Sequence, residues 1–258
     1  MTEPIKFAAQ SHTGLVRENN EDTYELVYPG PGYPLALVLA DGMGGHSKGE
    51  IASEIATEFV ASFLREYLLN PRTSTELARQ LQELVKKANV KVYLSSLDDK
   101  ENQGMGTTLT AAILLPDRLI TAHVGDCRAY ILTEGQLRQL TVDHTLVQEL
   151  VDAGSITAAE TRTHPRRNVL TRALGFPDFV NPDITDTPVA AGDRILLCSD
   201  GLHGFVPDDL IFQLAQAGET PSEVVQSLVQ AALAAGGEDN VTILCAFVPG
   251  QTAQEDQP

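Results

Sequence analysis

Four aspartates share one local context, because each stands beside a short apolar run typical of a buried β-strand. The pairs are Asp41-Gly42 after residues 35–40, Gly125-Asp126 after 121–124, Asp200-Gly201 after 195–198, and Asp239-Asn240 before 241–248. A single Asp-Gly pair is typical of a plain turn. Four carboxylates at strand ends can instead converge at one edge of a sheet, where two charges ~4 Å apart repel by about 4 kcal/mol at an effective dielectric of about 20. Such a cluster requires cations, and oxygen ligands without Cys or His favour Mg²⁺ or Mn²⁺ over Zn²⁺.

A second group of reactive side chains lies in the segment Arg17-Glu18-Asn19-Asn20-Glu21-Asp22. The Arg17 guanidinium offers a planar, bidentate donor pair for a phosphate dianion, and Glu21 and Asp22 add carboxylates beside it. For this segment taken alone, a surface ion pair in a loop is the alternative interpretation. Together with the aspartates, the segment indicates a site that combines cations with a phosphate-binding arginine.

Several other kinds of phosphate and nucleophile chemistry lack their motifs. The glycine-rich stretch at 42–49 has Lys48 before Gly49, so the Gly-Lys-Ser/Thr of a P-loop is missing. No cysteine is followed six residues later by an arginine, and Ser199 does not stand in a nucleophile elbow. The sequence therefore offers no obvious nucleophile for covalent catalysis.

The charge balance argues against nucleic acid and membranes as partners. The 258 residues include 35 acidic and 18 basic side chains, and the net charge of -17 repels nucleic acid and anionic lipid surfaces. No secretory signal is visible near the start, and the apolar runs are too short to span a bilayer. Cys127, Cys198 and Cys245 lie in apolar runs without a CxxC pair, as expected for reduced, buried thiols in a cytoplasmic protein.

The elements that must position these residues include three helices. Apolar residues recur in pairs every four positions from residue 51 to 68, which makes one apolar face. A second helix is predicted to begin at Thr73, where Glu76 completes a capping box, and a third at Thr220 with Pro221 at the first helical position.

Strands are predicted at residues 35–40, 107–115, 119–124, 128–133, 194–198 and 241–248. The turns Pro116-Asp117 and Glu134-Gly135 fit antiparallel hairpins. Because the strands come in clusters instead of alternating with helices, we expect an antiparallel α+β fold in one domain over residues 1–249. Residues 141–188 are expected to form a long, partly helical excursion, and residues 250–258 a disordered tail.

Six segments follow one another in a recognisable order: RENNED at 17–22, ADGMGG at 40–45, GTT at 106–108, VGDCR at 124–128, SDGL at 199–202 and EDNVT at 238–242. This order resembles the motifs of the PP2C-like, metal-dependent protein phosphatases, and HPRRNVLTRALG at 164–175 resembles their bacterial branch. Any one motif is weak, but the complete ordered set covers nearly the whole chain. The resemblance implies a four-layer α-β-β-α sandwich, with two antiparallel sheets packed together and helices on both outer faces.

The resemblance also implies a role for each residue of the site. Two tightly held Mn²⁺ or Mg²⁺ ions would be bridged by Asp41 and bound by the Gly42 carbonyl, Asp200 and Asp239. Asp126 with Asp200 would hold a weaker third ion, while Glu21 and Asp22 would act mostly through metal-bound waters. Arg17 would hold the phosphate of the substrate.

The implied activity is hydrolysis of phosphoserine and phosphothreonine in proteins, in opposition to a bacterial Ser/Thr kinase. A water bridging the ions would lose a proton near neutral pH and attack phosphorus in line, while Arg17 and the ions neutralise oxygen charge. Eukaryotic relatives place a histidine after the Asp-Gly step where this chain has Met43, so His46 or solvent is the expected proton donor to the leaving group.

The excursion at 141–188 corresponds to the flap of the family, which affects substrate choice. It carries Arg162, Arg166, Arg167 and Arg172. Arg166 and Arg167 are expected to bind or steer phosphopeptides, and pairing with surface carboxylates is the alternative.

Two further classes of function stay open. A pseudophosphatase would keep the fold as an interaction module, although every expected metal ligand is retained. A two-metal phosphodiesterase or nuclease would conflict with the acidic charge. We expect the phosphatase to be a monomer.

Overall fold

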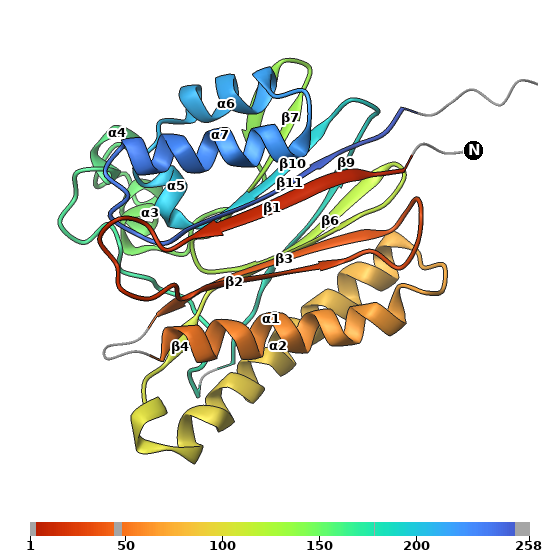
Figure 1. The fold of residues 1–258 in the computed structure, drawn as a ribbon. Helices are drawn as coiled ribbons and strands as arrows, with labels where there is room; N and C mark the ends of the chain where they lie inside the picture. Colours follow the sequence, from red (N-terminus) through yellow and green to blue (C-terminus); the bar gives the residue numbers. More distant parts are fainter. Residues whose placement is uncertain (1–3, 44–47, 178, 251–258) are drawn as a thin grey trace, which may run out of the picture.

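The computed structural model describes residues 4–43, 48–177 and 179–250, which form four layers (Figure 1). Two antiparallel sheets lie face to face in the middle, and a pair of helices covers the outer face of each sheet. The predicted fold class, an α-β-β-α sandwich, is therefore confirmed.

One sheet has the strand order β1-β11-β10-β7-β8, and every pairing in it is antiparallel. Its strands are β1 (Lys6–His12), β7 (Arg128–Thr133), β8 (Gln136–Gln139), β10 (Arg194–Cys198) and β11 (Val241–Phe247). Helices α6 (Asp208–Ala217) and α7 (Pro221–Ala234) cover its outer face.

The other sheet has the order β2-β3-β5-β6-β9, and a short strand, β4, pairs with the end of β3. Its strands are β2 (Asp22–Val27), β3 (Leu35–Met43), β4 (Gly106–Thr107), β5 (Leu109–Leu114), β6 (Arg118–Val124) and β9 (Asp183–Pro188). Helices α1 (Gly49–Tyr67) and α2 (Ser74–Asp98) cover its outer face, and the short η1 (Lys100–Asn102) follows α2.

Strand β3 shows why the central strands read as continuous apolar runs. Its odd-numbered residues Leu35, Leu37 and Leu39 point into the core between the two sheets. Ala36, Val38 and Ala40 alternate with them and pack under α1 and α2. Both faces of the strand are thus buried, since side chains alternate between the faces of a sheet.

The predicted helices and hairpins are present with small shifts in their ends. The Thr73 hydroxyl accepts from Glu76 N and the Glu76 carboxylate accepts from Thr73 N, so the predicted capping box is formed. The turns after β5 and β7 both close antiparallel hairpins. At the second turn, Glu134 and Gly135 both have positive φ, which is typical of a tight two-residue hairpin.

Sequence patterns missed four strands, β1, β2, β8 and β9, and each of them is the edge of a sheet. Residues on these strands are mostly half-buried or exposed, whereas β5 is buried throughout. An edge strand has polar and apolar residues mixed, because part of its surface meets water. The excursion expected at residues 141–188 is therefore shorter than predicted, because its last six residues form β9.

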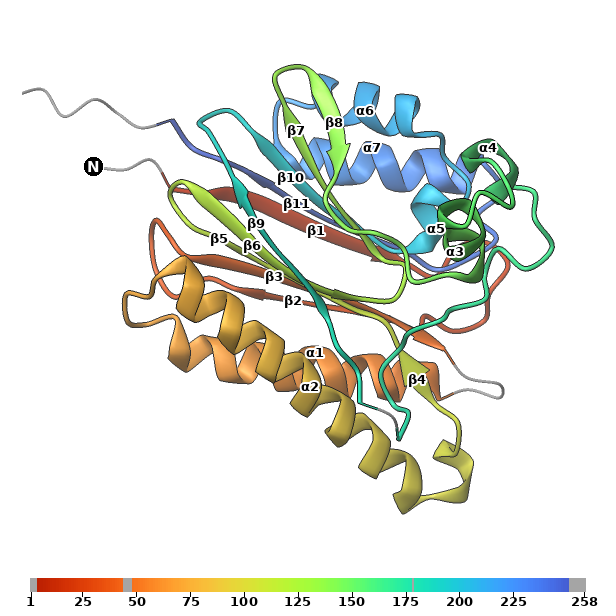
Figure 2. The same cartoon turned by 180° about the vertical axis from the view of Figure 1, so that it is seen from behind.

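The rest of the excursion gathers at one end of the sandwich. It contains two short helices, α3 (Leu146–Asp152) and α4 (Ala158–Thr161), and α5 (Asp200–His203) lies beside them. From α4 the chain runs past β4 to α2 and then enters β9 (Figure 2). In the part of the chain that the structure describes, no helix is both long and apolar enough to cross a membrane.

Candidate metal centre

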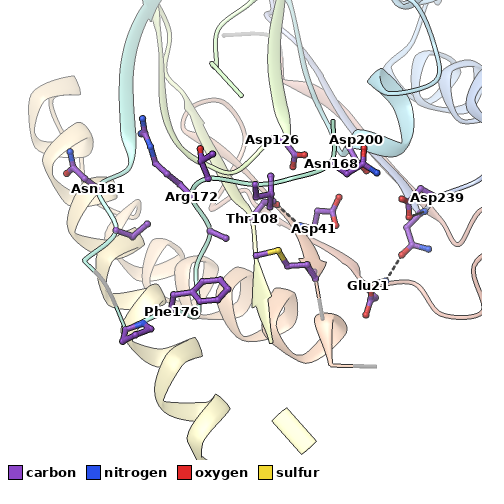
Figure 3. A pocket seen from close by; sticks show the side chains of 18 of the residues that line it. Glu21, Asp41, Thr108, Asp126, Asn168, Arg172, Phe176, Asn181, Asp200 and Asp239 are labelled. Carbon is purple, nitrogen blue, oxygen red and sulfur yellow. Dashed lines mark hydrogen bonds between the residues drawn. The ribbon is translucent and has the colours of Figure 1, made fainter. Parts of the chain in front are cut away.

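A pocket of about 670 Å³ collects most of the predicted site residues. It is lined by Arg17, Glu21, Asp41, Gly42, Asp126, Asp200 and Asp239. Figure 3 shows the five labelled carboxylates on one side of this pocket, with Phe176 and Asn181 on the other. Residues separated by more than two hundred positions in the sequence thus face one cavity.

Asp41 is held in place by the two threonines that precede β5. Its backbone N donates to Thr108 Oγ1 at 2.8 Å, and its carbonyl accepts from Thr108 N and from Thr107 Oγ1, both at 2.9 Å. The next residue, Gly42, lies so close to the start of α1 that an added Cβ would be 2.1 Å from the Gly49 carbonyl oxygen. Only glycine fits here, which leaves the backbone of Gly42 accessible at the pocket wall.

Asp22 lies behind the pocket and faces Asp41 across the β2–β3 pairing. Its Oδ2 accepts from Ser199 Oγ at 2.7 Å, and Ser199 Oγ in turn accepts from Thr242 N at 3.0 Å. Its Oδ1 is buried and has no partner among the described residues. Asp22 does not line the pocket itself, but its Oδ1 can still accept a hydrogen bond or bind a cation.

Asp239 and Asn240 join the loop before β11 to the segment at 17–22. Arg17 Nη2 donates to Asp239 Oδ2 at 2.8 Å, and the Arg17 side chain is half exposed. Asn240 Oδ1 accepts from Glu21 N at 2.8 Å, while its Nδ2 donates to two carbonyls of the same loop region. This network keeps the arginine and the carboxylates of the two segments together.

Asp200 approaches the pocket from the segment after β10, and Asp126 approaches it from the turn that joins β6 of one sheet to β7 of the other. Asp200 begins α5, and an added Cβ on Gly201 would be 1.9 Å from the Asn240 carbonyl oxygen, so α5 packs directly on the loop that carries Asp239. Asp126 is buried in the turn between β6 and β7, and its carbonyl contacts His203 Nε2 at 2.9 Å. Asp126 and Asp200 also line a neighbouring pocket of about 100 Å³.

Burial and mutual repulsion raise the pKa values of the carboxylates of the site. Burial raises the pKa of Asp22 to about 7 and that of Asp200 to about 6, and the charge of Asp239 adds to both. Burial also raises the pKa of Asp41 well above its usual range, with further contributions from the charges of Asp22, Asp200 and Asp126. The pKa of Asp126 is raised for the same reasons. The pocket thus concentrates more negative charge than its own groups can balance.

This donor set fits hard divalent cations. The acidic groups facing the cavity offer oxygen alone, and the unpartnered Asp22 Oδ1 stands just behind them. Within the described ranges, no three acidic, histidine or cysteine side chains are close enough to form a ready-made cage for an ion. Mg²⁺-like ions keep several waters, need only one or two carboxylates each and prefer oxygen ligands.

The remaining predicted residues are spread more widely. His46 lies outside the described residues. Arg167 lines the smaller neighbouring pocket, whereas Arg166 is exposed and lines neither of the two pockets that contain carboxylates. Two other flap arginines have structural partners, because Arg162 donates to the carbonyls of His203 and Val206, and Arg172 pairs with Asp183.

Sequence reasoning assigned no role to the neutral polar residues that hold the carboxylates. Ser199 and Asn240 stand beside site residues and Thr108 ends the GTT motif, but a hydroxyl or amide carries no distinctive sequence signal. Their roles become visible only through hydrogen bonds that join residues far apart in the chain.

Comparison with known sequences identifies the family. The profile described as "Protein phosphatase 2C" matches residues 12–236. The chain belongs to the protein phosphatase 2C family.

Two relatives and one solved structure show how similar its members are to this chain. "Serine/threonine protein phosphatase PstP" of Mycobacterium tuberculosis is 40% identical over 254 residues, which are 98% of this chain but 47% of that protein. The chain thus spans about half the length of this relative. "Serine/threonine phosphatase stp" of Listeria monocytogenes is 39% identical, with 90% of this chain and 91% of that protein covered. The crystal structure of the PstP catalytic domain in complex with two manganese ions has a TM-score of 0.82 and 39% identity, with 95% and 98% of the two chains covered.

Proposed function

We propose that this chain is a metal-dependent phosphatase that removes phosphate from serine and threonine side chains of proteins. The observation that carries the proposal is the convergence of acidic residues from loops of both sheets on one pocket, with Arg17 at its rim. The names of the relatives, both Ser/Thr phosphatases, support the same reaction class.

Two divalent ions, Mn²⁺ or Mg²⁺, would be held by Asp41, the Gly42 carbonyl, Asp200 and Asp239. The manganese ions bound by the PstP catalytic domain support this assignment. When bound, such ions supply charge neutralisation and an activated water for attack on phosphorus. Glu21 and Asp22 would orient these ligands, and Asp126 with Asp200 would hold a weaker third ion.

Arg17 would bind the phosphate group. Arg17 pairs with Asp239, which keeps the guanidinium at the pocket rim. Its side chain is half exposed, so the other N–H groups of the guanidinium can donate to a phosphate in the pocket. The Thr108, Ser199 and Asn240 hydrogen bonds would hold the acidic residues in place.

The proposal also covers the substrates, the counterpart kinase and the cellular compartment of the enzyme. Its substrates would be phosphorylated proteins, and its counterpart a Ser/Thr kinase, with the phosphatase acting as a monomer built from a single domain over residues 1–249. The three free, buried cysteines support a reducing compartment such as the cytoplasm.

The test compares wild type with Asp41→Asn on a phosphothreonine peptide in the presence of Mn²⁺. We expect wild-type turnover that chelation abolishes, and a loss of at least ~100-fold in kcat/KM for the variant, because it lacks a negative charge that would help to hold the ions. Folding of the variant is checked by circular dichroism.

The competing functions give different results when Mn²⁺ binding and turnover of a phosphodiester and of nucleic acid are measured as well. A folded wild type that binds Mn²⁺ without turnover would identify a pseudophosphatase. Faster cleavage of a phosphodiester or of nucleic acid than of the phosphopeptide would identify the other class of two-metal enzyme.

A further inference from the structure

The pocket that holds the carboxylates has a second half of opposite character. Away from the acidic end, its wall is made largely of apolar side chains from the flap: Leu170, Ala173, Phe176, Pro177, Phe179 and Val180. Met43, two residues after Asp41 on β3, lines the same cavity. In Figure 3, Phe176 lies across the pocket from the labelled carboxylates.

Met43 and Phe176 connect the two halves. Gly106 on β4 lies beneath both, because an added Cβ there would be 3.0 Å from Met43 Cε and 3.1 Å from Phe176 Cε2. The two side chains therefore meet above one glycine. Met43 and Phe176 thus link the strand that carries Asp41 to the apolar side chains of the flap.

The backbone around Phe176 is tied to two other elements. Leu174 and Thr107 exchange backbone hydrogen bonds of 2.8 and 3.1 Å, which attach the flap to β4. Asn89 on α2 accepts from Gly175 N at 2.8 Å and donates to the Phe176 carbonyl at 3.3 Å. The part of the wall around Phe176 is thus preformed, and little ordering of it is required before a ligand packs there.

The aromatic side chains of this wall are exposed to water. Phe176 is 42% exposed and Phe179 is fully exposed, at 104% of the reference area. A cluster of exposed apolar groups at the edge of a functional pocket is typical of a recognition surface. Covering these rings with another apolar side chain would remove both surfaces from water.

We propose that the wall formed by Met43, Phe176, Phe179 and Val180 binds a bulky apolar side chain of the substrate, close to the phosphorylated residue. The inference rests on the proposed phosphatase function. Met43 lies about 7 Å along the strand from Asp41, and about two residues of an extended peptide cover this distance. Substrates with Leu, Met or Phe within two positions of the phosphothreonine are therefore favoured over those with acidic or small polar residues.

The experiment measures kcat/KM for phosphothreonine peptides with Mn²⁺, with Leu placed in turn at each position from two before to two after the phosphothreonine. Peptides with Gly or Asp at the same positions are the references. We expect one Leu position to raise kcat/KM by roughly 10-fold over Gly, the range of one apolar contact in a specificity pocket.

The variant Phe179→Ser removes an exposed ring without disturbing the core. It should lower kcat/KM for the favoured Leu peptide by roughly 5-fold and leave the Gly peptide unchanged. Val169→Ser is the matched control, because Val169 is also an exposed apolar flap residue, at 44%, but does not line the pocket. This control should leave both peptides unchanged.

The outcomes distinguish a failure of this inference from a failure of the proposed phosphatase function. Turnover of all peptides at the same kcat/KM, or an equal loss for Leu and Gly peptides in Phe179→Ser, would overturn the apolar wall while leaving the phosphatase intact. Absence of turnover of every peptide by the wild type would overturn the proposed function itself.

Discussion

At the scale of single residues, the site depends on neutral side chains that restrain charged ones. Ser199 illustrates this, since its hydroxyl donates to the Asp22 carboxylate while accepting from a backbone N–H of β11. Asn240 acts similarly on the backbone of Glu21. Asp22, Asp41 and Glu21 are thus held near one another, despite their mutual repulsion, by hydrogen bonds to separate neighbours.

His123 offers a residue-scale prediction on pH. It is buried, its Nδ1 contacts Thr110 Oγ1 at 2.9 Å, and its ring lies 4.8 Å from that of His144. Burial, with a contribution from the charge of His144, lowers the pKa of His123 from 6.5 to about 4. The folded state therefore keeps this residue neutral at a pH where the unfolded chain binds a proton.

Because of this difference in pKa, the protein becomes less stable as the pH falls. The stability linked to neutral His123 is fully present above pH 6.5 and is lost as the pH falls toward 4. Between pH 7.5 and 5, the unfolding free energy of wild type should fall by about 2 kcal/mol relative to that of His123→Gln. Urea denaturation of both proteins with EDTA at the two pH values checks this. A difference that does not change with pH would show that His123 titrates normally.

At the scale of elements, the central strands and the edge strands differ in how clearly the sequence encodes them. Strands β3, β5, β6, β7, β10 and β11 are all predicted from apolar runs, because both of their faces are buried. The four edge strands read as mixed segments. Pairing with an already formed neighbour, more than their own composition, makes them strands.

The flap provides a prediction at this scale. Arg167 lines the small pocket beside Asp126 and Asp200, whereas the adjacent Arg166 does not. We therefore expect Arg167→Ala to raise the KM for a phosphopeptide by roughly 2- to 5-fold through lost attraction to the negatively charged substrate. Arg166→Ala is the matched control and should have a smaller effect.

The measurement is steady-state kinetics at low and at moderate salt, because screening weakens such attraction. A small aryl phosphate serves as the second substrate. Equal effects of Arg167→Ala on the aryl phosphate and on the phosphopeptide would argue against peptide steering.

At the scale of the whole molecule, the site joins the two sheets. Asp22 and Asp41 belong to strands of one sheet, while Asp200 and Asp239 stand next to β10 and β11 of the other. Cations bound between them would connect the layers at the end where the flap also lies. Metal binding is therefore expected to stabilise the entire fold and not only the loops.

This leads to a prediction on thermal unfolding. Mn²⁺ at about 100 times its Kd should add about 2.7 kcal/mol to the stability, which corresponds to roughly 5–10 °C in Tm for a protein of this size. Chelation with EDTA should reverse the shift, and Asp41→Asn should lack it. The control Asp98→Asn, at the exposed end of α2, should keep it. An equal shift in Asp41→Asn would place the stabilising ion elsewhere.

The sequence by itself determined the central strands, the two long helices, the family and the set of acidic residues. These features depend on patterns over a few neighbouring positions, such as an apolar run or an Asp-Gly step, or on motifs in a fixed order. The predicted fold followed from them.

Only the tertiary structure decided which of those residues share a pocket. It shows that Asp22 lies behind the cavity and that Arg167, but not Arg166, lines the smaller pocket. It also shows that apolar flap residues line the large pocket across from the acidic end. The physical reason is that such contacts join segments more than two hundred residues apart. Their geometry is set by how the two sheets and the flap pack, which no local pattern contains.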